Sequence, residues 1–151
     1  MPTERDIMPK RESIGKWIST IYRRSQIYIN KELAQYDLSS SQFLVMLILD
    51  HTDDAHQETV SHELHLDKAT ITRAVNKLMK QGYVTREVDP TDKRAYVLKI
   101  TKKGRKLVPE IRKVLDQTSR IFLAGFTTQE KAIALDLLKR MYQNITAIDD
   151  Q

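Results

Sequence analysis

Cysteine is absent from the 151 residues of the chain, which excludes disulfides, thiol redox sensing and zinc–thiolate sites. Glycine and proline are scarce, with four of each, so the chain is not rich in linkers and is not typical of an all-β protein. No run approaches the roughly 18 consecutive apolar residues of a membrane span. The polar N-terminus also has no signal-peptide core. These absences predict a soluble, cytoplasmic protein with no membrane partner.

The net charge of +5 is unevenly distributed along the chain. Residues 68–113 hold 14 Lys/Arg against 4 Asp/Glu, whereas the remainder holds 11 against 16. A basic middle between mildly acidic ends is typical of a surface that binds a polyanion. Charge alone leaves open a second interpretation, an ordinary solvated helix face with excess lysine.

Hydrophobic spacing predicts a mainly α-helical chain with one small β-hairpin. A helix over 12–35 is followed by a buried helix, which begins at Ser39 with Gln42 in the pattern of a capping box. A polar loop is expected over 51–57, and then two short helices. The β-rich runs YVTREV and AYVLKI predict a two-stranded ribbon.

Two more helices are expected at the end of the chain, from Thr101 to about Gly125 and over about 128–147. Pro109 lies inside the first three turns of the first one, so it would kink that helix or force a later start. In the second, Thr127 and Glu130 form another capping-box pattern.

Two short helices followed by a β-hairpin give the element order of a winged helix-turn-helix. The second short helix starts after Asp67, a good N-cap, and ends before Gly82. Its inner face holds regularly spaced apolar residues: Ile71, Val75 and Leu78. Its opposite face holds short or hydrogen-bonding residues: Ala69, Thr72, Arg73 and Asn76.

That opposite face suits the major groove of duplex DNA. Arg and Asn can recognise guanine and adenine edges, and Thr can contact a thymine methyl group. Lys68 and Lys77 flank the face and suit phosphates. Since no acidic residue occurs between Lys68 and Lys80, the face is unlike a solvated helix laced with Glu/Lys pairs. The pattern therefore predicts binding to double-stranded DNA.

The run DKATITRAVNKLMKQGYVTREVDPTDKRAYVLKITKKGRKL resembles the core of the MarR (multiple-antibiotic-resistance regulator) family. Its matching elements are TxTRxVxKLxxxGYVxR and DPxDKRxxxLxxTxxG. The resemblance implies one MarR-type domain over 1–151. A winged-helix DNA-binding part would span about 38–101, and dimerisation helices about 10–36 and 102–148. It also implies a homodimer on a pseudo-palindromic operator, more often a repressor than an activator.

The same resemblance implies that Arg94, at the tip of the hairpin, enters the minor groove and that Asp92 orients it. A narrow minor groove attracts arginine, and a nearby carboxylate can hold a guanidinium in place beforehand. The full set of predicted DNA-binding residues is Lys68, Ala69, Thr70, Thr72, Arg73, Asn76, Lys77, Arg86, Asp92, Lys93 and Arg94.

Family members have a crevice that accepts small, often aromatic and anionic, effectors that release the DNA. Arg23 or Arg24 would stand at its mouth to pair with a carboxylate. Packing in the core or at the dimer contact is the alternative role for the residues of this crevice. The predicted ligand-binding residues are Trp17, Ile21, Tyr22, Ser25, Tyr28, Phe43 and Met46.

Two positions depart from the family pattern. His65 stands in the helix-turn-helix turn where glycine is frequent, and Ser61 stands where alanine is preferred. Since histidine tolerates a positive φ better than most residues, His65 is predicted to be a turn residue.

Other classes of site are weakly supported. Asp53, Asp54 and Glu58 lie near four histidines, which would allow a zinc or manganese site. The histidines lack metal-binding spacing, however, and favour a polar surface. They are His51, His56, His62 and His65. There is no phosphate-binding glycine loop or catalytic motif, so neither an enzyme nor a cofactor is predicted. The alternative function for the chain is a winged-helix module that binds other proteins and not DNA.

Overall fold

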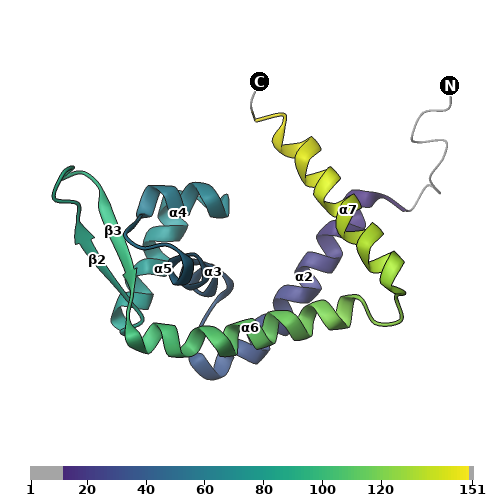
Figure 1. The fold of residues 1–151 in the computed structure, drawn as a ribbon, viewed down its shortest axis with the longest axis horizontal. Coiled ribbons are helices and arrows are strands. Elements are labelled where there is room, and N and C mark those ends of the chain that lie inside the picture. The colour runs from purple at the N-terminus through teal and green to yellow at the C-terminus, as the bar shows by residue number, and fades with distance from the viewer. Residues whose placement is uncertain (1–11, 150–151) are drawn as a thin grey trace. The chain divides into compact units, whose positions relative to one another are not determined.

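The structure is a computed structural model that describes residues 12–149. The chain divides into two compact units, one ending at Leu115 and the other beginning at Asp116. The first unit contains α2 (Ile14–Leu33), η1 (Ala34–Tyr36), α3 (Ser40–His51), β1 (Ala55–His56), α4 (Gln57–Leu64), α5 (Lys68–Lys80), β2 (Val84–Val88) and β3 (Tyr96–Ile100). Helix α6 (Lys102–Phe122) begins in the first unit and ends in the second, which also holds α7 (Thr128–Thr146) (Figure 1).

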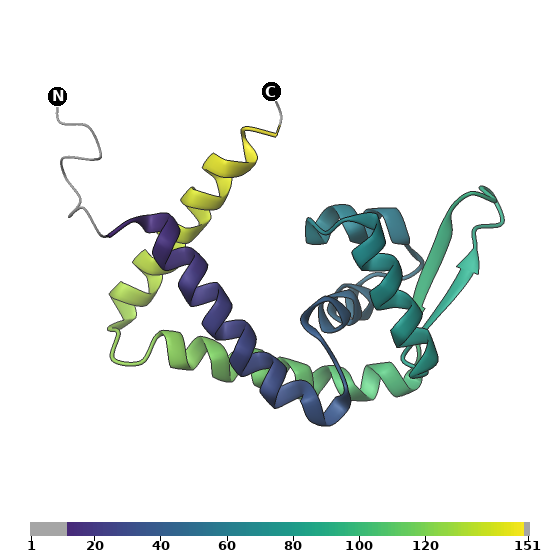
Figure 2. The same ribbon diagram turned by 180° about the vertical axis from the view of Figure 1, so that it is seen from behind.

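The chain is mainly α-helical with one small antiparallel sheet, as predicted. The two predicted strands form the β2–β3 hairpin, and the sheet has a third strand that the sequence did not predict, in the order β1-β3-β2. The predicted loop over 51–57 contains the missing strand, because Ala55 pairs with Leu98 and His56 with Val97. A strand of two residues is too short to show an alternating pattern in the sequence. Figures 1 and 2 show the β2–β3 hairpin projecting beyond the helices of its unit, as a wing does.

Capping residues set the helix starts as the sequence predicted. The main-chain N–H of Ser39 donates to Oε1 of Gln42 at 2.7 Å, and Thr127 and Glu130 form the second capping box. Asp67 accepts a hydrogen bond from the main-chain N–H of Thr70 at 2.7 Å. These contacts satisfy N–H groups that the first turn of a helix leaves without partners.

Helix α6 differs in detail from the prediction. The hydroxyl of Thr101 accepts from the main-chain N–H of Gly104 at 3.1 Å, so the helix begins at Lys102. Pro109 therefore does not force a later start. The helix ends at Phe122, shortly before the predicted Gly125.

The helix-turn-helix turn depends on the two residues that depart from the family pattern. His65 adopts the left-handed conformation with φ of 53°, as its tolerance of positive φ predicted. The hydroxyl of Ser61 donates to the main-chain oxygen of Leu66 at 2.6 Å. Alanine could not make that contact, so Ser61 adds a hydrogen bond that closes the turn between α4 and α5.

One apolar core fixes the orientation of α5. The inner face of α5 is fully buried in this core, where the helix packs against α3, α4 and β2. Because that face cannot turn outward, the opposite face of α5 must meet solvent or a partner. The core residues with no exposed surface are Leu33, Val45, Met46, Val60, Ile71, Val75, Leu78, Leu98 and Ile111.

The first and last helices leave large apolar residues exposed. On α2, Trp17 is 47% exposed and Ile21 is 49% exposed. Helix α7 has no buried residue, and Ile133 and Leu138 are each 57% exposed. Within residues 12–149, no helix has the length and apolar character needed to cross a membrane.

Candidate nucleic-acid interface

The outer face of α5 presents the predicted DNA-binding residues to solvent. Ala69, Arg73, Asn76 and Lys77 are exposed, whereas Thr72 is half-buried. The Thr72 hydroxyl donates to the main-chain oxygen of Lys68 at 2.8 Å and accepts from Gln57 at 3.2 Å. Because that hydroxyl is satisfied inside the protein, a contact of Thr72 with thymine would use its methyl group.

The N-terminal turn of α5 holds its polar side chains in place. Thr70 donates to Oδ2 of Asp67 at 2.9 Å and accepts from Nη2 of Arg73 at 3.3 Å. The hydrogen bonds from the Thr70 main chain and hydroxyl lower the pKa of Asp67, so this carboxylate stays charged as a cap. Arg73 is thereby placed beside the helix start and remains exposed for a base or a phosphate.

Lys77 and Gln81 connect the far end of α5 to the turn before α3. Nζ of Lys77 lies 3.2 Å from Oδ1 of Asp37, and Nε2 of Gln81 donates to the main-chain oxygen of Asp37 at 2.7 Å. Both charged side chains of the ion pair are well exposed, so the pair contributes little and can be exchanged for a phosphate contact. Asp37 could not be predicted as a partner from the sequence, because it lies 40 residues from Lys77.

Arg86 joins the wing to α5. It lies on β2 and its Nη1 donates to Oδ1 of Asn76 at 3.3 Å. Its guanidinium carbon stands 4.6 Å from the ring centre of Tyr96, which is the geometry of a cation–π contact. The predicted site residues Asn76 and Arg86 are therefore brought together, with Tyr96 as a supporting residue that sequence reasoning missed.

Asp89 anchors the base of the wing. Its Oδ1 accepts from the main chain and the hydroxyl of Thr91, each at 2.8 Å, and its Oδ2 lies 2.6 Å from Nε2 of His56. The hydrogen bond with His56, followed by those from Thr91, holds the pKa of Asp89 far below its ordinary value. The Asp-Pro-Thr sequence is a signal for this turn, since an Asp side chain often bonds the main chain two residues on.

Asp92 makes its hydrogen bonds at the tip of the wing with the main chain. Oδ1 of Asp92 accepts from the main-chain N–H of Arg94 at 3.0 Å, and its main-chain oxygen accepts from Ala95 at 3.0 Å. Among the ion pairs of residues 12–149, none joins Asp92 to the Arg94 guanidinium. Asp92 therefore shapes the backbone of the turn, while Lys93 and Arg94 are exposed at the tip.

The predicted effector residues differ widely in burial. Phe43 and Met46 are buried in the core with 2% and 0% exposure, whereas Trp17 and Tyr22 are exposed on α2. Ser25 and Tyr28 are half-buried on the same helix. The two buried residues would have to move before any ligand could touch them.

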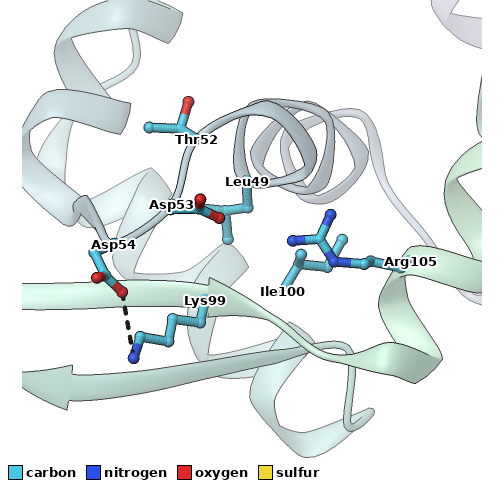
Figure 3. Close-up of a pocket in the computed structure, with 7 residues that line it drawn as sticks. All are labelled: Leu49, Thr52, Asp53, Asp54, Lys99, Ile100 and Arg105. Carbon is cyan, nitrogen blue, oxygen red and sulfur yellow. Dashed lines mark ion pairs between the residues drawn. The ribbon is translucent and has the colours of Figure 1, made fainter.

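A surface pocket lies elsewhere, between the end of α3, β3 and the start of α6 (Figure 3). Lys99 pairs there with Asp54 at 3.3 Å, and with Glu87 at 3.8 Å, which raises the pKa of Lys99. Arg105 pairs with Asp50 at 3.2 Å. The charges of the pocket are thus largely compensated by one another.

In the described part of the chain, no group of three or more His, Cys, Asp or Glu residues is placed to hold a metal ion.

Comparison with known proteins gives consistent matches. The model of the MarR family matches residues 38–96. The HTH-type transcriptional regulator YybA of Bacillus subtilis (strain 168) is 30% identical over 128 residues, which are 85% of this chain and 85% of that protein. The crystal structure of a MarR transcriptional regulator from Methanosarcina mazei Go1 is 37% identical with a TM-score of 0.84, covering 89% of this chain and 97% of that one. The crystal structure of MarR is 25% identical with a TM-score of 0.85, covering 95% and 97%.

A helix-turn-helix with a projecting hairpin and an exposed basic helix face defines the class of winged-helix, DNA-binding transcriptional regulators. The relatives above place the chain more narrowly within that class. It belongs to the MarR family.

Proposed function

We propose that the protein is a sequence-specific repressor that binds a pseudo-palindromic operator as a homodimer. The observation that carries the proposal is the outer face of α5, where Arg73, Asn76 and Lys77 are exposed while the opposite face is locked in the core. Helix α5 enters the major groove, and its polar side chains contact base edges and phosphates. The repressor role follows the habit of the family, and it requires that the operator overlap the promoter.

The wing supplies the second contact with the DNA. Arg94 and Lys93 stand exposed on a turn that Asp92 and Asp89 shape by hydrogen bonds to the main chain. A preformed turn lowers the conformational entropy that binding would otherwise cost. Arg94 enters the minor groove, where the negative potential is enhanced if the groove is narrow.

Dimerisation uses the terminal helices, over about 10–36 and 102–148, and leaves about 38–101 for DNA. Monomeric soluble proteins rarely leave large contiguous apolar patches exposed, and both α2 and α7 carry half-exposed apolar residues. A two-fold symmetric partner would cover these faces and place two α5 helices about one DNA turn apart.

A small aromatic or anionic effector would release the DNA only by binding the DNA-incompetent dimer more tightly than the competent one. A tenfold loss of DNA affinity requires a preference of at least about 1.4 kcal/mol. The aromatic residues of α2, with Arg23 or Arg24 beside them, are the groups that would meet such a ligand. Binding can be followed through the fluorescence of Trp17, the single tryptophan.

The testing experiment is selection of binding sites from random duplex DNA by the full-length protein, repeated with aromatic carboxylates such as salicylate. The proposal predicts recovery of an inverted repeat whose half-sites lie about ten base pairs apart. Recovery of no common sequence would overturn it.

The alternative is a winged-helix module that binds another protein. Such a module needs neither a basic helix face nor a charged wing tip, and this chain has both. Binding that weakens steeply with added salt supports DNA as the partner, whereas binding that is insensitive to salt supports a protein partner.

A further inference from the structure

The contact between Arg86 and Asn76 has a consequence for which base Asn76 can recognise. An asparagine side chain carries an acceptor, Oδ1, and a donor group, Nδ2. Pairing with adenine uses both, because adenine offers a donor at N6 and an acceptor at N7. Guanine offers two acceptors, O6 and N7, and cytosine offers a donor.

Arg86 uses one of the two lone pairs of Oδ1, the acceptor atom of the Asn76 amide. Nη1 of Arg86 donates to Oδ1 of Asn76 at 3.3 Å. A guanidinium has donors only, so the oxygen of the amide must face it and the amino group must face away. The positive charge beside Oδ1 also disfavours the approach of a second donor, such as N6 of adenine.

The position of Arg86 is itself restrained. It stands on β2, half-buried, with its guanidinium against the ring of Tyr96 at 4.6 Å. Strand β2 is paired along its whole length with β3, including Val88 with Tyr96. The wing therefore holds Arg86 in place, and Arg86 in turn holds the side chain of an exposed residue on α5.

We propose that Arg86 is a specificity-determining residue that acts through Asn76, a role that rests on the proposed DNA binding. With Oδ1 held by Arg86, Asn76 presents Nδ2 to the major groove and selects a base edge made of acceptors. Guanine is then preferred over adenine at the base pair that Asn76 contacts.

The test is selection of binding sites from random duplex DNA with the wild-type protein, Asn76→Ala, Arg86→Leu and the double variant. Leucine keeps an apolar side chain against Tyr96 but has no donor. The position that loses its preference in Asn76→Ala identifies the base pair contacted by Asn76. We expect guanine there for the wild type, and a relative shift toward adenine of at least about fivefold in Arg86→Leu. In the Asn76→Ala background, Arg86→Leu should not alter the preference at that position.

Lys93→Leu is the matched control. Like Arg86→Leu it removes one positive charge from the wing, but at the tip of the hairpin and not on strand β2. It should weaken binding to all sequences without changing the base preference at the Asn76 position. Thermal unfolding of each variant separates a loss of folding from a loss of specificity.

The outcomes separate the two proposals. A wild-type protein that selects no sequence overturns the proposed function and this inference with it. A selective protein that prefers adenine at the Asn76 position retains the function and overturns the inference. The same conclusion follows if Arg86→Leu weakens sites with guanine and sites with adenine by one common factor.

Discussion

Nε2 of His56 lies 2.6 Å from Oδ2 of Asp89, which ties the residue before α4 to the base of the wing. Asp89 is only 9% exposed and also bonds Thr91 through its other oxygen. One carboxylate therefore connects the helix-turn-helix to the hairpin, although the two residues are 33 positions apart in the chain.

This arrangement predicts a loss of stability in acid that depends on Asp89. The folded state lowers the pKa of Asp89 below its ordinary value of 3.8, so it binds the proton less readily than the unfolded state does. The stabilisation is therefore complete above that value and is lost as the pH falls through the lower pKa of the folded state. Urea unfolding of wild type and Asp89→Asn, compared from pH 6 downward, should show a difference that shrinks in acid. A difference that stays constant to pH 2 would contradict the role assigned to this carboxylate.

Gly104→Ala should destabilise the protein. A Cβ at this position would meet the main-chain oxygen of Tyr83 and would lie 2.7 Å from Cγ1 of Ile100. Overpacking of this kind costs about 1–3 kcal/mol. Gly15→Ala is the matched control, because nothing lies within 4 Å of its added Cβ. In a helix that exchange should stabilise by about 0.5–1 kcal/mol. Urea unfolding at one protein concentration measures the stability of both variants. Equal unfolding midpoints for Gly104→Ala and wild type would contradict the close packing around Gly104.

Arg73→Ala and Lys77→Ala should weaken DNA binding in different ways. Loss of a base contact by Arg73 should cost about 1–3 kcal/mol and relax the preference at one position per half-site. Loss of a phosphate contact by Lys77 should weaken all sequences alike and reduce the salt slope by about one. Fluorescence anisotropy on the selected operator and its point variants measures both effects. Unchanged affinity and preference in Arg73→Ala would mean that another face of α5 meets the DNA.

Asp92 should act through the main chain of the wing. Asp92→Ala removes the acceptor for the Arg94 N–H and should weaken DNA binding even though it removes a negative charge. Asp92→Asn keeps an oxygen at the same place and should retain most of the affinity. If Asp92→Asn were as weak as Asp92→Ala, a charge interaction with the Arg94 side chain would be the better explanation. Tighter DNA binding by Asp92→Ala would mean that Asp92 affects binding only through the repulsion between its negative charge and the DNA.

Removal of residues 127–151 should abolish a well-behaved dimer. These residues include α7, whose apolar side chains are exposed in the single chain. Sedimentation velocity should show a monomer or aggregates, and DNA affinity should fall because two linked half-sites are no longer engaged. A truncated protein that remains a stable dimer would place the dimer contact elsewhere.

Local signals in the sequence predicted most of the fold. The caps at Ser39, Asp67 and Thr127 and the left-handed turn at His65 depend on residues within a few positions of each other, so they are visible in the chain. The apolar spacing of α5 likewise predicted which face is buried, and hence which residues are exposed on the candidate site.

Most of the missed features depend on contacts between different secondary-structure elements. Strand β1 exists because Ala55 and His56 meet β3, and its two residues show no strand pattern alone. Contacts such as His56 with Asp89, or Arg86 with Asn76, arise only when the hairpin packs against the helices. The resemblance to a family implied that Asp92 orients Arg94, and the structure adds a hydrogen bond from the Arg94 main-chain N–H to the Asp92 carboxylate.

The most direct test of DNA recognition is the affinity of the full-length protein for its selected operator and for a scrambled duplex, measured by anisotropy across a salt series. A winged-helix regulator should bind the operator at least about a thousandfold more tightly than the scrambled duplex at physiological salt. The logarithm of both affinities should fall linearly with the logarithm of salt concentration. Equal affinities for the two duplexes, or binding that does not respond to salt, would contradict the account.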